Sequence, residues 1–480
     1  MANQCAGVLG ALRGSVQGRV LGAADEDYQN ARRVWNGMID RHPLAIVQAS
    51  GIADIAPTIA LARDSGLALA IRGGGHGVAG YGTVDDGIVL DLALLRAVDV
   101  DAQARLVTVG AGATLGDIDR ATEPHRLAVP IGVVSGTGIA GLTLGGGIGW
   151  LTRPYGLTID NLVAADVVLA TGELVRASES EHPDLFWGLR GGGGNFGVVA
   201  SFTFRAHPLD PDVFAGTLIY ERPRWGDALR AFLDWTVHLP EELTTLITFM
   251  VPPPDWDLGD RVLMFLGFAW AGRAREHGMA QIERLQARCR ADVAVLDPTR
   301  WIAFQSAFDL MVPKGVRAYW RNASFSRLDD AAIETIVDHC GAQTWYGTAA
   351  DLHHMGGAFG RVPEEETAFP DRSAQFWLNV YGFWPSPDED AARIAWVKGF
   401  SDAMRPHSLP NQYVNFLGAD SDDPRLKALA AYGPSKLERL IALKRRYDPT
   451  NVFRINHNLP PGLAGETQGN GSTEDSGHPV

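Results

Sequence analysis

Glycines surround a histidine in the segment Ile71–Gly77, which reads Ile-Arg-Gly-Gly-Gly-His-Gly. Consecutive glycines tolerate positive φ angles and bring backbone N–H groups close to an anion such as a pyrophosphate. The segment lacks a terminal Lys-Ser/Thr pair and does not match G-x-G-x-x-G, so it fits neither a P-loop nor a nicotinamide Rossmann site. A tight turn that exposes His76 is the alternative that this segment alone leaves open.

A second glycine-rich segment runs from Gly132 to Trp150 and contains eight glycines and no charged residue. A loop rich in backbone groups and poor in side chains suits a flat, fused-ring ligand that the main chain approaches closely. A purely structural loop is the alternative, but turns alone poorly explain two such loops in one region. Three more segments carry polar groups near glycines or asparagines: 152–162, 185–199 and 447–461.

The residues that must position the first loop predict a strand–helix–strand unit. Residues 44–50 are a short apolar run, residues 51–66 have helical spacing and end at Gly66, and residues 67–75 form a second strand that runs into the glycines. Residues 161–178 predict a β-hairpin that turns at Thr171–Gly172. Beyond residue 210 the chain is richer in Trp and Phe, and alternating strand-like and helix-like stretches predict a second, α+β domain.

These patterns divide the 480 residues into parts, since one hydrophobic core seldom serves so long a chain. The predicted parts are a helical lead-in (1–39), a first domain (40–210), a second domain (211–404), a C-terminal segment that completes the first domain (405–463) and a disordered tail (464–480).

Composition narrows the class of protein. A formal net charge of −14 argues against binding to nucleic acid or to an anionic membrane. The three cysteines, Cys5, Cys289 and Cys340, are far apart and lack metal-ligand spacing, so we expect neither a disulfide framework nor a metal site. With no signal-like N-terminus and no membrane-length apolar run, we expect a soluble, cytoplasmic protein.

The order of the five segments resembles the berberine-bridge-enzyme-like branch of the vanillyl-alcohol-oxidase, or PCMH-type, flavoprotein superfamily, in its bacterial type. The resemblance covers residues 40–210 and 405–461 and is faint between them. It implies an α+β fold, in which a PCMH-type FAD-binding domain of two α/β subdomains lies beneath a substrate domain. An antiparallel sheet of the substrate domain would then roof the flavin.

The resemblance also implies how FAD is held. His76 would bond through a ring nitrogen to the 8α-methyl carbon of the flavin, and many relatives add a cysteine in the second loop. Here Val134 stands at that position, so we expect a single covalent attachment without a cysteinyl link. The other residues that would contact FAD, mostly through their backbone, are Arg72, Gly73, Gly74, Gly75, Gly77, Gly132, Ser135, Gly136, Thr137, Gly138, Ala140, Gly141, Leu142, Gly145, Val198, Val199, Asn456 and Asn458.

Candidate catalytic residues follow from the same resemblance. Tyr413 and Asn415 match a Tyr-x-Asn segment from which relatives draw catalytic groups, but a phenol needs a lowered pKa to act as a base. Glu366, which precedes an Ala-Phe-Pro-x-Arg stretch, is a second candidate base, with a solvated acidic loop as the alternative. Thr137 aligns with a residue that controls oxygen access in relatives. His353 and His354 are weaker candidates, because ordinary core or surface histidines are common.

The expected function is oxidation of a small organic molecule, by hydride transfer to a covalently bound flavin, with O2 as acceptor and H2O2 as product. We expect a role in specialised metabolism. A dehydrogenase of the same fold with another acceptor and a non-catalytic flavin- or metabolite-binding protein are the alternatives. The aromatic residues between 211 and 400 predict either an apolar pocket or an aromatic core, so the sequence does not name the substrate.

Overall fold

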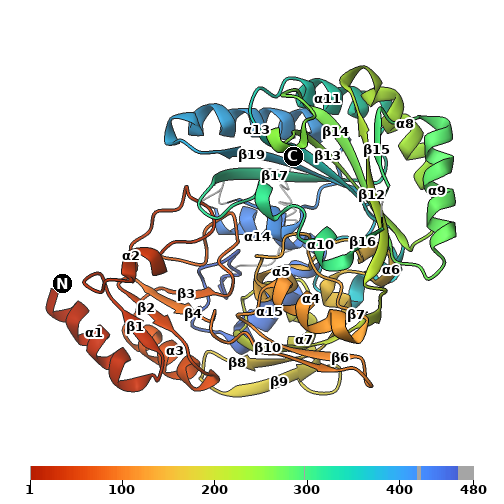
Figure 1. Ribbon diagram of the computed structural model, residues 1–480. Coiled ribbons are helices and arrows are strands. Elements are labelled where there is room, and N and C mark those ends of the chain that lie inside the picture. Colours follow the sequence, from red (N-terminus) through yellow and green to blue (C-terminus); the bar gives the residue numbers. More distant parts are fainter. Residues whose placement is uncertain (1, 297, 419–422, 463–480) are drawn as a thin grey trace, which may run out of the picture.

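The computed structural model describes residues 2–296, 298–418 and 423–462, with the side chains of residues 2–5 and 424 left out. A lower half built on two sheets faces an upper half built on one large sheet (Figure 1). The α+β architecture predicted from the sequence is confirmed. The predicted disordered tail, 464–480, lies outside the described residues.

The first sheet of the lower half has the order β1-β2-β4-β3. Its strands are β1 (Arg19–Leu21), β2 (Ala45–Gln48), β3 (Leu69–Arg72) and β4 (Ile88–Asp91). Strands β2, β3 and β4 are parallel, with helix α3 (Ile55–Asp64) crossing from β2 to β3. The predicted strand–helix–strand unit is therefore confirmed, and β3 ends where the first glycine loop begins.

The N-terminal residues are more than a helical lead-in. They include helices α1 (Ala2–Ser15) and α2 (Tyr28–Ala31), but β1 also pairs antiparallel with β2. The segment that follows α2 then passes into the space between the two halves, where Trp35 and Asn36 are buried. This segment therefore contacts both halves, and the predicted boundary at residue 39 stays a prediction.

The second sheet of the lower half is antiparallel and has the order β5-β6-β10-β8-β9. Its strands are β5 (Val98–Asp101), β6 (Leu106–Gly110), β8 (Leu162–Val168), β9 (Leu174–Ser178) and β10 (Val198–Arg205). Strands β8 and β9 form the predicted hairpin, in which Gly172 takes a φ of 90°. Helices α14 (Pro424–Tyr432) and α15 (Pro434–Tyr447) share the core of this lower half through residues such as Ala431, Leu440 and Ile441.

The upper half is one antiparallel sheet in the order β15-β12-β14-β13-β18-β19-β17, with β16 paired to β12. Its strands are β12 (Asp212–Tyr220), β13 (Leu243–Val251), β14 (Leu263–Trp270), β15 (Val293–Val295), β16 (Pro298–Arg300), β17 (Arg317–Phe325), β18 (Gly347–His354) and β19 (Phe376–Trp384). Four helices cover its outer face in Figure 1: α8 (Trp225–Thr236), α9 (Arg275–Arg288), α11 (Asp330–Gly341) and α13 (Asp390–Met404).

The period-two alternation of a strand divides the side chains of this sheet between its faces. Ile247, Leu352 and Leu378 pack in one cluster with residues of the covering helices. Asp351 and Tyr381 point the other way and line a cavity toward the lower half. The sheet thus gives apolar residues to the core and a mixed set of residues to the cavity.

The predicted boundaries at residues 210 and 404 stay predictions. The first falls between β11 (His207–Pro208) and β12, and the second falls at the end of α13. In the part of the chain that the structure describes, no helix is long and apolar enough to cross a membrane.

Candidate active site

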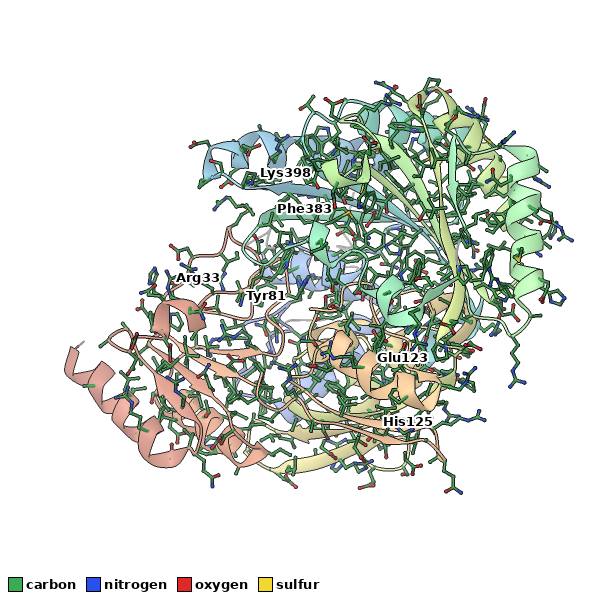
Figure 2. The ribbon with its side chains drawn as sticks, in the orientation of Figure 1. Arg33, Tyr81, Glu123, His125, Phe383 and Lys398 are labelled. Carbon is green, nitrogen blue, oxygen red and sulfur yellow. The ribbon has the colours of Figure 1, made fainter. Side chains whose placement is uncertain are left out.

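A cavity of about 380 Å³ lies between the two halves. We call its lower wall the floor; it consists of the first glycine loop (72–77), the second loop (132–148) with helix α5 (Ile139–Gly145), and parts of 193–199 and 453–457. We call its upper wall the roof; it consists of the cavity-facing residues Leu246, Thr348, Asp351, His353, Trp320, Tyr381 and Phe383. In Figure 2, Tyr81 from the floor side and Phe383 from β19 mark the two walls.

The first glycine loop follows β3 and carries His76 at the cavity wall. Gly75 takes a φ of 65°, a conformation that a residue with a side chain rarely adopts. Burial lowers the pKa of His76 to about 4, while its own backbone and the Asp309 carboxylate oppose that shift. The imidazole is therefore neutral at pH 7, which leaves one ring nitrogen with a free lone pair.

Arg72 lies buried at the start of the same loop. Its guanidinium donates to the Asp91 carboxylate on the neighbouring strand, with 2.8 Å between Nη2 and Oδ2. The other terminal nitrogen, Nη1, is buried and has no hydrogen-bond partner among the described residues. A buried guanidinium N–H without a partner is costly, so this atom is suited to an anionic group bound in the cavity.

The two glycine loops meet backbone to backbone. A Cβ atom on Gly138 would lie 2.3 Å from the backbone nitrogen of Gly74, and a Cβ on Gly74 would lie 2.4 Å from that of Gly138. By contrast, Cβ atoms on Gly141 and Gly194 would meet no protein atom within 4 Å, although both glycines line the cavity. Some glycines thus let the loops touch, and others leave bare backbone facing the cavity.

The roof carries the one carboxyl group among the described residues that line the cavity. Asp351 lies on β18, opposite Thr248 of β13 and Asn379 of β19. Burial raises the pKa of Asp351 to about 6, while the nearby hydroxyls of Thr248 and Tyr381 lower it in part. Its Oδ1 has no hydrogen-bond partner among the described residues. A carboxyl group with this pKa is suited to accept a proton near neutral pH.

Tyr413 and Asn415 lie together at the join between floor and roof. The Tyr413 hydroxyl accepts hydrogen bonds from the Gly147 backbone N–H (2.8 Å) and from Asn415 Nδ2 (2.8 Å). Burial raises the pKa of Tyr413 to about 12, and these two donated bonds only partly oppose it. No cation among the described residues lowers that pKa, so Tyr413 is a neutral hydroxyl at pH 7. Its role as the base stays a prediction. Asn415 also donates to the Leu142 carbonyl (3.0 Å) and so connects this corner to the second loop.

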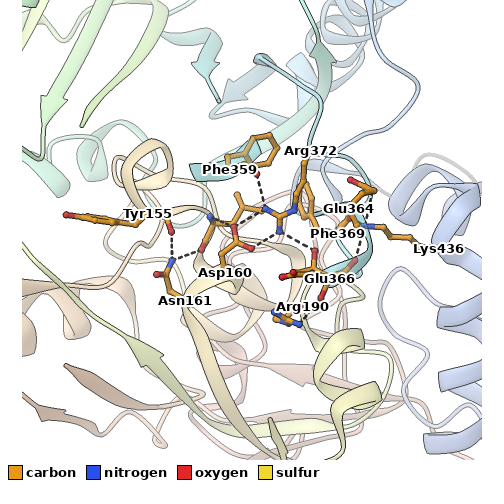
Figure 3. A network of polar contacts seen from close by, with 12 residues as sticks. Tyr155, Asp160, Asn161, Arg190, Phe359, Glu364, Glu366, Phe369, Arg372 and Lys436 are labelled. Atoms are coloured by element: carbon orange, nitrogen blue, oxygen red, sulfur yellow. Dashed lines mark hydrogen bonds and ion pairs between the residues drawn. The ribbon is translucent and has the colours of Figure 1, made fainter. Parts of the chain in front are cut away.

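The Ala-Phe-Pro-x-Arg stretch has a structural role in a polar network, at the centre of Figure 3. Arg372 forms a buried ion pair with Asp160 (2.6 Å), and its guanidinium also donates to the Phe359 carbonyl (3.2 Å). Lys436 donates to the backbone carbonyls of Glu364 and Phe369. This network holds residues 364–372 against the lower half and places Phe369 beside the Tyr413 ring, with 6.1 Å between centroids.

Glu366, the second predicted base, lies in this segment but away from the cavity. It is exposed and does not line the cavity wall. Only its backbone carbonyl takes part in the network, accepting from Arg190 Nη2 at 2.7 Å. The alternative interpretation, a solvated acidic loop, matches this placement.

Most of the predicted contact residues lie together at the cavity. Its lining includes Arg72, Gly73, Gly74, Gly75, His76, Gly77, Gly132, Thr137, Gly138, Ala140, Gly141, Leu142, Gly145, Val198, Val199, Asn456, Tyr413 and Asn415. Ser135, Gly136 and Asn458 are not in that lining. Ser135 instead donates its backbone N–H to Asp309 of the upper half (2.8 Å), and its hydroxyl donates to the other carboxylate oxygen.

The side chains of the two adjacent histidines point to opposite faces of the sheet, as the alternation along a strand requires. His353 lines the cavity, and burial lowers its pKa to about 4. His354 points to the opposite face, where it contacts Arg153 Nη1 at 3.1 Å and stacks on Phe376.

Two functional candidates escaped the sequence analysis: Asp351 and Trp35. Asp351 sits in the alternating run Thr-Ala-Ala-Asp-Leu-His-His, so period-two spacing places it on the same face as His353. Nothing in the sequence says that this face is the one toward the cavity. Trp35 was assigned to the lead-in, and no local pattern connects it to His76.

The donor set fits FAD. Backbone facing the cavity at Gly141 and Gly194 leaves room for a flat ring or a diphosphate, and the unpaired Arg72 Nη1 supplies a cation for a phosphate. Asn456 adds a buried, unpaired amide oxygen at the far end of the floor. In the described residues no group of three His, Cys, Asp or Glu side chains is placed to hold a metal ion.

Comparison with known proteins agrees with this fit. The sequence model described as FAD binding domain matches residues 43–178, and that described as berberine and berberine like matches residues 412–460. An FAD-linked oxidoreductase of Dictyostelium discoideum is 30% identical over 452 residues, covering 93% of this chain and 95% of the relative. The bacterial type of the family stays a prediction.

Solved structures share the fold. The crystal structure of 6-hydroxy-D-nicotine oxidase from Arthrobacter nicotinovorans has a TM-score of 0.83 at 25% identity, covering 93% of this chain and 98% of that one. Glucooligosaccharide oxidase from Acremonium strictum, which carries a 6-S-cysteinyl, 8α-N1-histidyl FAD, has a TM-score of 0.83 at 24% identity, covering 95% and 99%. This chain is an FAD-binding oxidoreductase and belongs to the berberine-bridge-enzyme-like, FAD-linked branch of the vanillyl-alcohol-oxidase (PCMH-type) flavoproteins.

Proposed function

We propose that the protein is an oxidase that removes two electrons from an alcohol- or amine-bearing carbon of a small organic molecule and delivers them to O2. The observation that carries this proposal is Asp351, a carboxyl group with a pKa of about 6 on the roof, across the cavity from the glycine loops. Oxidation of such a carbon requires a group that takes the hydroxyl or amine proton, and Asp351 is suited to that task.

The floor binds the cofactor in this proposal. FAD, when bound, supplies a hydride acceptor at N5 and a route for the electrons to O2, which becomes H2O2. The backbone of Gly138, Gly141 and Gly194 would contact it, and Arg72 Nη1 would donate to a phosphate. His76, neutral at pH 7, is the single covalent attachment point at the 8α carbon.

A second, cysteinyl link is not part of the proposal. Val134 lines the cavity at the position where the second loop would carry a cysteine. Cys289 and Cys340 are buried in the core on the outer face of the sheet instead. Thr137 also lines the cavity on this loop, and we propose that its small side chain admits O2.

Asp351 acts together with neutral neighbours. Tyr381, whose pKa burial and the Asp351 charge raise, remains a hydroxyl that can donate to the substrate oxygen or nitrogen. Burial raises the pKa of Tyr413 to about 12, so at pH 7 it is a hydroxyl that can donate into the same corner of the cavity. His353 is neutral at pH 7, so Asp351 is the only charged group that we assign to the roof.

The walls around Asp351 are aromatic. Trp35, Phe308, Trp320, Tyr381, Phe383 and Phe416 line the cavity. This lining suits an uncharged or cationic substrate with an apolar body, and it disfavours an anionic one because the roof offers no cation. Relatives named for hydroxynicotine and for oligosaccharides include both amine and alcohol substrates, which supports the chemical class but not one compound.

We also propose a cytoplasmic location and a role in specialised metabolism; cell fractionation and the neighbouring genes would test these.

A dehydrogenase with another electron acceptor is the competing function. To separate the two, purified protein is screened with aromatic alcohols and amines under air. An oxidase releases one H2O2 for each substrate molecule oxidised. If the substrate reduces the flavin but air does not reoxidise it, the oxidase is rejected and the dehydrogenase is favoured.

A further inference from the structure

The ring of Trp35 covers the ring of His76. The two centroids are 4.6 Å apart and the planes differ by 20°, so the rings are stacked. Trp35 is buried, with 4% of its surface exposed. Within the described ranges the His76 ring forms a hydrogen bond with its own backbone but with no other residue, so the stack on Trp35 is its main contact with another side chain.

Three hydrogen bonds hold Trp35 in place. Its backbone N–H donates to the Gly75 carbonyl (2.9 Å), which directly precedes His76 in the chain. Its backbone carbonyl accepts from the Gly315 N–H (2.8 Å), and its indole Nε1 donates to the Val312 carbonyl (3.0 Å). Trp35 is therefore bonded both to the glycine loop below and to the upper half above.

The residues around Trp35 make it a rigid wall. On other sides of the indole lie Trp320, with a centroid distance of 5.7 Å, and Phe383, edge-on at 6.3 Å. The next residue, Asn36, donates its side-chain amide to the carbonyls of Val78 and Ala318, both at 2.9 Å. Because a side chain packed against two rings and held by an indole hydrogen bond has few alternative rotamers, Trp35 restricts the orientation of the imidazole stacked on it.

We propose that Trp35 is a positioning residue that orients the His76 imidazole for covalent attachment of the flavin. This inference rests on the attachment to His76 proposed above. The reaction replaces a C–H bond of the 8α-methyl group with a C–N bond to the ring nitrogen. The methyl group and the imidazole N–H each give up a hydrogen, and O2 takes up these two protons and two electrons as H2O2.

Orientation matters for this reaction because the lone pair of one nitrogen must point at one carbon. A misplacement of about 1 Å in a reacting group can cost about 10²-fold in rate. An imidazole free to rotate would present its nitrogen productively for only part of the time. The stack removes that freedom, and the neutral state of His76 keeps the lone pair available.

The experiment measures attachment separately from binding. Full-length apoprotein from riboflavin-limited cells is mixed with FAD, and the yellow chromophore that stays with the acid-denatured chain is followed over time. Variants are Trp35→Ala, Trp35→Phe and, as a matched control, Trp256→Ala, whose indole is 43% exposed. Non-covalent FAD affinity is compared between His76→Ala and the His76→Ala/Trp35→Ala double variant.

We expect Trp35→Ala to slow attachment by about 10²-fold, while Trp35→Phe, which keeps an aromatic ring, recovers most of the rate. The control should match the wild type, and the double variant should bind FAD as His76→Ala does. Attachment at the wild-type rate in Trp35→Ala would overturn the inference. A loss of non-covalent FAD affinity in the double variant as large as the loss of attachment rate in Trp35→Ala would also overturn the inference. Trp35 would then only support the shape of the binding site. Wild-type protein that releases all its FAD in acid would instead reject the parent proposal of attachment.

Discussion

The floor and the roof of the cavity differ in the chemical groups that they present. The floor presents backbone: Gly74 and Gly138 touch main chain to main chain, and Gly141 faces open space. The roof presents side chains, such as Asp351 and Tyr381, from strands locked in antiparallel register. A floor of backbone suits a cofactor that does not vary, whereas a roof of side chains suits a substrate that differs from one relative to another.

The largest expected effect comes from the roof. Asp351→Asn removes the base but keeps the shape of the side chain, so flavin reduction by substrate should slow by about 10²–10⁴-fold. Flavin content should not change, because the floor is intact. Anaerobic mixing of substrate with the flavoprotein measures the rate. Equal reduction rates in the two proteins would remove Asp351 from the mechanism.

The same residue predicts a pH dependence. The active form of the base is the carboxylate, and the pKa is about 6, so wild-type kcat/KM should fall as pH drops below 6. The Asn variant should lack this limb. The folded pKa also lies above the ordinary value of 3.8, so the folded state binds the proton more tightly. Between those two values the free energy of unfolding should therefore decrease as pH rises, and it should do so less in the variant.

A substitution in the floor should lower the bound flavin content and leave the base on the roof unchanged. Gly138→Ala places a Cβ against the Gly74 backbone nitrogen, which cannot move aside cheaply. We expect a loss of about 1–3 kcal/mol in the free energy of unfolding and a loss of bound flavin. Gly136→Ala is the matched control, because its Cβ meets nothing within 4 Å. Denaturant titration and the visible spectrum give both quantities; normal stability and flavin content in Gly138→Ala would refute the close approach.

The smallest effect on activity is expected at an exposed residue outside both walls. Glu366→Gln changes an exposed side chain that does not reach the cavity, so activity should stay within about twofold of the wild type. A large loss of flavin reduction in Glu366→Gln would restore it as a candidate base and weaken the claim that the roof supplies the chemistry.

Arg372→Ala, in the same segment, leaves the buried Asp160 carboxylate unpaired and should destabilise the fold by about 3–5 kcal/mol.

The same contrast explains what the sequence could predict. Glycine loops are local in the chain, so the floor and His76 could be predicted from short segments together with a family resemblance. The roof depends on register between distant strands, since Thr248, Asp351 and Asn379 come together only through pairing of β13, β18 and β19. Trp35 is 277 residues from Val312, whose carbonyl accepts its indole N–H, so no local pattern could indicate that contact.

For two candidate bases the sequence showed the residue type but not its surroundings. Tyr413 matched a motif, but its pKa depends on burial and on the Gly147 N–H, which the motif does not contain. Glu366 had the right residue type beside a familiar stretch, yet that stretch is anchored by Arg372 and Lys436 outside the cavity. In both cases the sequence gives the residue type, but burial and hydrogen-bond partners depend on the folded structure.

The central claim is that the floor holds the flavin through His76. The most direct measurement is to denature the purified protein in acid and to record whether the yellow chromophore stays with the polypeptide, in wild type and in His76→Ala. We expect the chromophore to stay with the wild-type chain and to be released as FAD from the variant. Release from the wild type, or retention in His76→Ala, would contradict it.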